Sequence, residues 1–171
     1  LNYTLFERDT LSRARESIYA YVNVVSAGLL HGHAAVPGFV GDHCDPRLHS
    51  DRLAKALLDT HADSIVGWKA RLTAVLADGN TDREDNALAT LLRLRDETNL
   101  PVMVHHIASN VPTDKLMFSL RTGDVYTHLY HGRSDSIFDP ESGAPSPEAL
   151  RARDRGVWFD VGHGVGAFRW Q

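Results

Sequence analysis

Five apolar segments rich in β-branched and aromatic residues alternate with helix-like segments, and this alternation limits the fold more than any other feature of the chain. The strand-like segments are residues 18–25, 64–72, 101–106, 124–129 and 157–162. Strands that alternate with helices pair in parallel, and strands of parallel sheets are buried on both faces. The sequence therefore predicts an α/β fold built on a parallel sheet.

The helix-like segments carry recognisable start and stop signals. Ser50 is expected to cap a helix through residue 62, and Thr81-x-x-Glu84 reads as a capping box for a helix ending near Asn99. A short helix is expected over 113–120, and Ser146-Pro147 opens a last helix that Gly156 closes. Residues 26–49 are rich in Gly and Pro and predict a long loop, a kind of segment that often carries function.

Composition excludes several classes of protein. The 171 residues are 43% hydrophobic and 23% charged, which predicts a packed globular domain rather than a disordered chain. Eighteen Lys and Arg against 22 Asp and Glu lack the basic excess typical of nucleic-acid binding. A single cysteine, Cys44, allows no intrachain disulfide, and no apolar run approaches the ~18 residues of a membrane span. We therefore expect a cytoplasmic protein that binds neither nucleic acid nor membrane.

Polar side chains gather where the predicted strands end, which is the edge that carries the active site in (β/α) barrels and in open α/β sheets. Ten histidines are the one oddity of the composition. The groups at strand ends are Lys69, His105 with His106, His128 with His131, and Asp160 with His163. The expected functional site therefore lies at this edge.

Lys69 allows two interpretations, because a charged and unpaired lysine at the end of a buried strand is costly. It could extend out of the strand and pair with Asp63 or a loop carboxylate. It could instead lose its proton and react with CO₂, giving a carbamate whose two oxygens bridge two metal ions. His105 and His128, at the ends of the next two strands, would then supply imidazole nitrogens to the same metals.

At these residues the chain resembles the amidohydrolase superfamily, and within it the amidohydrolase/deacetylase metallohydrolases of the dihydroorotase-like group. The resemblance covers nearly the whole chain from Phe6 onward, and four motifs in the same order carry it. They are Gly67-Trp68-Lys69-Ala70-Arg71-Leu72, Pro101-Val102-Met103-Val104-His105, Gly123-Asp124-Val125-Tyr126-Thr127-His128-Leu129-Tyr130-His131-Gly132, and Phe159-Asp160-Val161-Gly162-His163-Gly164.

The resemblance implies a partial (β/α)8 TIM barrel, roughly strands 3 to 7 of a metal-dependent hydrolase barrel. Residues 1–171 then form a single segment of that domain, with both ends appearing truncated. Lys69 would be a carboxylated lysine that bridges two zinc ions, His105 and His128 would be further ligands, and a metal-bridging hydroxide would be the nucleophile. Substrate-binding roles fall to Arg71, for which an ion pair within the protein is the favoured alternative, and to His131 and His163, for which plain loop positions are equally open.

Position 105 is preferred to 106 as the ligand, because it brings the downstream proline and Gly-Asp pair into the family's register. The side chain of His106 points to the opposite face of the strand. It would pack on the outer side or support the ligands.

Two further motifs look like metal ligands but are rejected on spacing. His31-Gly32-His33 looks like the H-x-H pair of a first barrel strand, yet Lys69 follows His33 by only 36 residues, too few for three βα units. Asp160 follows His128 by 32 residues, which is one unit and places it on strand 7 rather than 8. The histidines at 31, 33, 43 and 49 are interpreted as loop residues.

The preferred function is hydrolysis of an amide or ester bond in a small acylated compound, most simply deacetylation. A dihydroorotase-type cyclic amide hydrolase stays open, as does a lyase of the aldolase type that forms a Schiff base through Lys69. An inactive barrel fragment is the third alternative, because the segment alone lacks ligands. A longer parent would act on a small molecule, and it could also be a homo-oligomer.

Overall fold

The computed structural model describes residues 7–25, 46–164 and 167–168, and five strands in this part of the chain form one sheet. The sheet order follows the chain order, and every neighbouring pair is parallel. The strands are β1 (Ala20–Asn23), β2 (Ile65–Leu72), β3 (Val102–His106), β4 (Val125–Thr127) and β5 (Trp158–Asp160). The α/β prediction is confirmed, and the arrangement is that of part of a (β/α)8 barrel.

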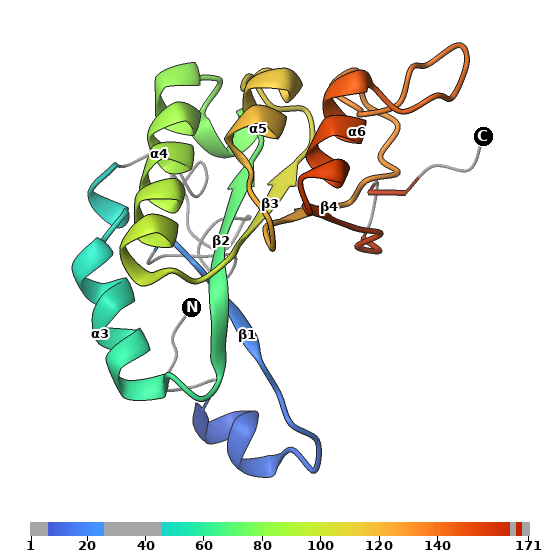
Figure 1. Ribbon diagram of the computed structural model, residues 1–171. Coiled ribbons are helices and arrows are strands. Elements are labelled where there is room, and N and C mark those ends of the chain that lie inside the picture. The colour runs from blue at the N-terminus through green and yellow to red at the C-terminus, as the bar shows by residue number, and fades with distance from the viewer. Residues whose placement is uncertain (1–6, 26–45, 165–166, 169–171) are drawn as a thin grey trace.

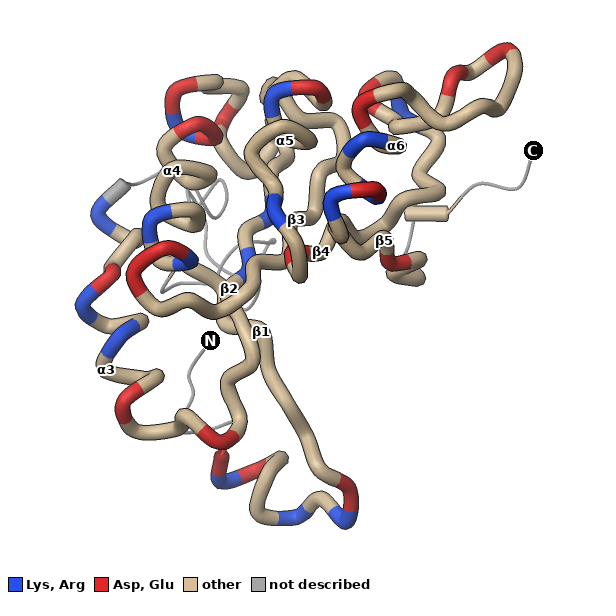
Figure 2. The backbone as a smooth tube through the Cα atoms, in the orientation of Figure 1, with Lys and Arg blue, Asp and Glu red and all other residues tan. Residues whose placement is uncertain are grey.

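Within the described residues, four α-helices lie between the strands, and α4, α5 and α6 lie along one face of the sheet (Figure 1). Both basic and acidic residues occur along the backbone of these three helices (Figure 2). None of the helices in the described part of the chain has the length and apolar character needed to cross a membrane. The helices are α3 (Asp51–His61), α4 (Thr81–Thr98), α5 (Thr113–Ser119) and α6 (Pro147–Asp154), with short 3-10 turns η1 (Leu11–Arg13), η2 (Pro46–Leu48) and η3 (Ala74–Ala77).

Two of the three predicted helix caps are confirmed. Ser50 accepts a hydrogen bond from the Leu53 amide at 3.3 Å, and Ser146 accepts one from the Ala149 amide at 3.2 Å. The capping box at the start of α4 is wrong, because Asn80 is the capping residue. Glu84 is instead fully buried and accepts hydrogen bonds from the Ser109 hydroxyl and the Asn110 amide, both at 2.8 Å.

The helix-covered face of the sheet holds the core. Alternate residues of the central strands point into it, including Trp68, Leu72 and Val104, all fully buried. The Trp68 indole donates a hydrogen bond to the Thr98 hydroxyl at 2.8 Å, which ties β2 to the end of α4. The driving force for the fold is burial on this face.

The opposite face carries Lys69, Arg71 and His105, which are half-buried. On this face Trp158 of β5 is 69% exposed. The expectation of strands buried on both faces therefore holds for only one face of the described sheet. The other face is where the predicted ligands of the polar site lie.

A buried carboxylate joins the starts of β3 and β4. The two oxygens of Asp124 accept hydrogen bonds from the Val102 amide at 3.0 Å, the Arg121 amide at 2.9 Å and the Arg95 guanidinium at 2.9 Å. The Asp124 side chain is fully buried and that of Arg95 is only 10% exposed. This ion pair and its amide contacts fix the register of β3 against β4 at their amino ends.

We expect Asp124→Ala to lower the free energy of unfolding by about 2 kcal/mol or more, because Arg95 loses its buried carboxylate and keeps only the exposed Asp96, and the Val102 and Arg121 amides lose their acceptor. Urea unfolding followed by tryptophan fluorescence measures the change. Asp154→Ala is the matched control, since its ion pair with Arg153 is exposed, and it should cost less than about 1 kcal/mol. Equal losses in the two variants would contradict this role for Asp124.

Candidate metal-binding site

Lys69 lies in β2 on the face opposite α4, α5 and α6, where its register neighbours are Asn23 and Met103. Burial and the charge of Arg71 lower the pKa of Lys69, and the negative charge of Asp160 opposes this shift. Gly67, two residues earlier on the same face, has no room for a side chain, because a Cβ would overlap the Tyr21 ring and the Pro101 carbonyl. The glycine of the Gly-x-Lys motif is therefore required by close strand packing beside the lysine.

His105 and His128 come together at the ends of β3 and β4. Their ring centroids are 4.8 Å apart and the rings are nearly perpendicular, at 80°. Burial first, then the charges of His128, Lys69 and Arg71, lower the pKa of His105 to about 3. The His105 ring is therefore neutral at physiological pH and offers a nitrogen lone pair.

Each of the two imidazoles has one nitrogen tied to the protein. The Nδ1 of His128 donates a hydrogen bond to the Gly162 carbonyl, which leaves Nε2 free. The Nε2 of His105 lies 3.2 Å from the Thr73 hydroxyl, which leaves Nδ1 free. Metal-binding histidines are usually held in this way, by a protein partner on the second nitrogen.

The backbone around His128 is unusual. His128 has a φ of 65°, which is rare for a residue other than glycine. Gly162 also has a positive φ, 51°, and a Cβ there would overlap the Thr127 hydroxyl and the His128 ring. Residue 162 must therefore be glycine for its carbonyl to hold the imidazole.

Asp160 ends β5 opposite Thr127, whose hydroxyl donates to its carboxylate. Its strand directly follows β4 in the sheet, which agrees with the spacing argument for one βα unit after His128. Although the sequence interpretation excluded Asp160 as a ligand, its charge acts on Lys69. Arg71 also belongs to this group, since it pairs in register with His105 and its charge lowers the pKa of both Lys69 and His105.

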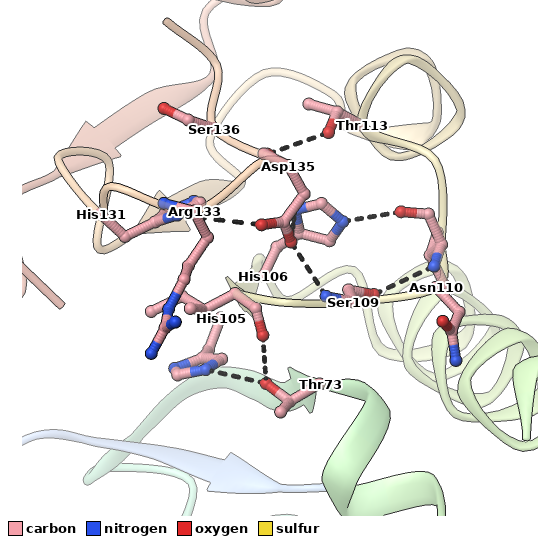
Figure 3. A network of polar contacts seen from close by, with 12 residues as sticks. Thr73, His105, His106, Ser109, Asn110, Thr113, His131, Arg133, Asp135 and Ser136 are labelled. Carbon is pink, nitrogen blue, oxygen red and sulfur yellow. Dashed lines mark hydrogen bonds and ion pairs between the residues drawn. The ribbon is translucent and has the colours of Figure 1, made fainter. Parts of the chain in front are cut away.

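His131 acts on this group through its charge, which adds to the lowering of the His105 pKa, but its ring points into the core. Its side chain is fully buried, and its Nε2 lies 3.3 Å from the Tyr126 hydroxyl. His106 is buried on the helix-covered face, where its Nε2 donates to the Val111 carbonyl at 2.8 Å. Both imidazoles face the Asp135 carboxylate, at 3.6 Å from His106 and 4.0 Å from His131 (Figure 3).

Asp135 also ties together the loops that follow β3 and β4. It accepts from the Ser109 amide at 2.9 Å, and its own carbonyl accepts from the Thr113 hydroxyl at 3.0 Å. The expectation that the side chain of His106 points to the face opposite His105 is confirmed. The substrate-binding role of His131 stays a prediction to which this buried position lends no support.

The remaining histidines lie elsewhere, and one of them, His61, is the last residue of α3. His163 is exposed and stacks on Phe168, with ring centroids 4.9 Å apart. His49 lies 3.3 Å from the Asn86 amide, and its backbone bridges to Val25. The predicted loop residues His31, His33 and His43 lie outside the described residues.

Within the described ranges, no group of three or more His, Cys, Asp or Glu side chains could hold a metal ion. The predicted donor set is different, because it contains two histidines and a lysine. In that prediction the lysine takes part as a carbamate, which carries a negative charge and two oxygens. The second ring nitrogens of His105 and His128 and the lowered pKa of Lys69 fit that requirement.

Two residues of the site were missed from the sequence, Thr73 and Gly162. Thr73 follows β2 directly, and its contact with the next strand has no pattern of its own in the chain. Gly162 belongs to the Phe159–Gly164 motif, but its contact with the His128 ring follows only from the position of its carbonyl.

Three curated deacetylases match most of the chain. The chain is 26% identical to a deacetylase of Enterococcus faecalis over 94% of its length, 30% identical to Deacetylase Atu3266 of Agrobacterium fabrum over 98%, and 29% identical to a deacetylase of Brucella anthropi over 98%. It spans 39–41% of the length of these relatives. No family model matches the chain.

Two solved structures share the fold. An adenine deaminase superposes with a TM-score of 0.82 at 25% identity, over 98% of this chain and 43% of that one. A dihydroorotase gives a TM-score of 0.75 at 23% identity, over 98% and 41%. The predicted relationship to the amidohydrolase superfamily is confirmed. This amidohydrolase-related chain corresponds to less than half of each structure, as the predicted partial barrel requires.

We expect Gly162→Ala to move the His128 ring, because the new Cβ has no space beside it. Gly143→Ala is the matched control, since Gly143 also has a positive φ, 69°, but has nothing within 4 Å of a new Cβ. The control should cost about 1 kcal/mol of stability, typical of a non-glycine residue in this conformation, and leave the NMR signals of His128 unchanged. Gly162→Ala should cost more and shift those signals. Identical effects of the two substitutions would contradict the packing argument.

Proposed function

We propose that this chain provides the lysine and the two histidines of a two-zinc site in a deacetylase, and that the lysine functions as a carbamate. The reaction is hydrolysis of the amide or ester bond of a small acylated compound. The deacetylase names of the relatives favour an acetyl group as the acyl part. Because the chain spans less than half of these relatives, the proposal concerns a protein that contains this chain.

The distribution of charge around Lys69 is the observation that carries the proposal. Arg71 and His105 lie on the same face as the lysine, and Asp160 is the acidic group that acts on it. Asp160 also accepts the Thr127 hydroxyl. A protonated Lys69 would therefore add a second cation beside Arg71. A carbamate at Nζ exchanges that positive charge for a negative one.

The chemistry then divides between the protein and the metal ions. Bound divalent ions would polarise the carbonyl of the substrate and lower the pKa of a water molecule. Lys69, His105 and His128 would hold the ions, and their protein partners, Thr73 and Gly162, would keep the two rings in place. Arg71, half-buried beside His105, is placed to hold an anionic group of the substrate or to balance the carbamate.

Lys69→Ala should remove both the metal and the activity. We expect zinc content after dialysis to fall to background and turnover of small N-acetyl and O-acetyl compounds to fall by at least about 100-fold. Growth in ¹³C-labelled bicarbonate should give a carbamate signal in the ¹³C spectrum that the variant lacks. Lys115→Ala, which removes an exposed lysine of α5, should change none of the three readouts. Unchanged metal content and turnover in Lys69→Ala would overturn the proposal.

The Schiff-base alternative gives a different result in the same samples. Borohydride treatment with a carbonyl compound in metal-free buffer would attach that compound to Lys69 if the amine were the nucleophile. We expect no such adduct at position 69 when the carbamate is present.

A further inference from the structure

Thr73 occupies the first position after β2 and has an unusual pair of contacts. It is the residue before η3, but its side chain makes no capping hydrogen bond there. Threonine at such a position ordinarily caps the following helix. Its hydroxyl is turned instead to the next strand, where it meets the His105 Nε2 at 3.2 Å and the Ile107 carbonyl at 2.8 Å (Figure 3).

The backbone on both sides of Thr73 holds these contacts in place. The Ile107 amide donates to the Leu72 carbonyl at 3.2 Å, and the Ala74 amide donates to the Ala108 carbonyl at 3.0 Å. The parallel ladder between β2 and the segment after β3 therefore continues past the strand ends. The Ile107 carbonyl is a fixed acceptor and does not depend on the Thr73 side chain for its position.

The Thr73 hydroxyl has one hydrogen for two partners, and this decides which atom donates in its contact with the His105 Nε2. A hydroxyl has one hydrogen to donate, and a carbonyl can only accept. The Thr73 hydrogen therefore lies toward Ile107, and a lone pair of the same oxygen faces His105. The His105 Nε2 must then carry a hydrogen, and the neutral ring has its remaining lone pair on Nδ1.

We propose that Thr73 is a positioning residue that holds His105 as the Nε2–H tautomer, with Nδ1 free to bind metal. This inference rests on the proposed function for the role of the free nitrogen, but the tautomer itself needs no metal. It gives Thr73 a part in the site through His105 rather than through direct contact with substrate.

His128 provides an internal control within the same molecule. The Gly162 carbonyl can only accept, so the hydrogen of His128 lies on Nδ1, and its free nitrogen is Nε2. The two rings, 4.8 Å apart, are therefore expected to be opposite tautomers. A change at Thr73 should alter the first ring and leave the second as it is.

The experiment is a long-range ¹H–¹⁵N correlation spectrum of the ¹⁵N-histidine-labelled chain at pH 7 without metal, with the two rings assigned from His105→Gln and His128→Gln. We expect the His105 pattern of a protonated Nε2 and the His128 pattern of a protonated Nδ1. Thr73→Val has nearly the same shape but no hydroxyl, so it should shift the His105 signals toward a mixture of tautomers. Thr73→Ser, which keeps the hydroxyl, should restore the original pattern.

Zinc affinity is the second readout. In a competition titration with a chelating dye, we expect Thr73→Val to bind zinc about 10-fold to 100-fold more weakly, and Thr73→Ser to stay within about threefold of the unchanged chain. A protonated Nδ1 on His105 in the unchanged chain would overturn the inference. So would an unchanged His105 pattern in Thr73→Val. If Thr73→Val does not fold, the spectra of the unchanged chain and of Thr73→Ser still decide the tautomer.

Failure of this inference is distinguishable from failure of the proposed function. Opposite tautomers that respond to Thr73→Val, in a chain whose zinc content is the same with Lys69→Ala, would support the positioning role and overturn the zinc deacetylase. Loss of zinc with Lys69→Ala, together with a His105 tautomer that is the same in Thr73→Val, would support the proposed function and overturn the positioning role.

Discussion

The Asp124 carboxylate is the interaction on which the arrangement of the site depends. It binds the amide of Val102 at the start of β3, and it precedes Val125, the first residue of β4. The register that follows pairs Met103 with Val125 and His105 with Thr127. Because the two strands start from one buried anchor, the histidines at positions 105 and 128 end at the same height. The Arg95 guanidinium of α4 neutralises the carboxylate, so that the anchor also joins the helix layer to the sheet.

Parallel pairing explains how much of the site could be predicted from the sequence. Strand ends meet at one edge of a parallel sheet, so the approach of His105 and His128, whose ring centroids are 4.8 Å apart, could be expected from their positions alone. The joint role of Lys69 with them stays a prediction. Spacing also placed Asp160 on the strand after β4, which the sheet order confirms. The choice between His105 and His106 rested on the family register, and the alternation of side chains along β3 places them on opposite faces.

The errors and omissions share a physical cause, since each involves a side chain whose partner lies on another strand or loop. Glu84 has the spacing of a capping box, but its carboxylate accepts hydrogen bonds from the Ser109 hydroxyl and the Asn110 amide in the loop after β3 instead. The substrate-binding role of His131 stays a prediction, but the turn after His128 sends the His131 ring inward to Tyr126. Thr73 has a capping position and uses its hydroxyl elsewhere. Local sequence spacing cannot anticipate such competition.

One face of the sheet carries the apolar core that stabilises the fold, and the other carries the polar side chains of the candidate site. Apolar side chains on the helix-covered face supply the burial that stabilises the fold, and the other face is left for groups that are costly to bury. That face carries Lys69, Arg71 and the paired rings of His105 and His128, and the charge of Asp160 acts on the lysine. Burial disfavours the protonated amine, and so does the charge of Arg71. The same conditions favour a neutral amine, which can add CO₂ and release a proton to give the carbamate anion that the proposed metal site requires. The environment that makes the lysine unfavourable as a cation therefore prepares it for the proposed role.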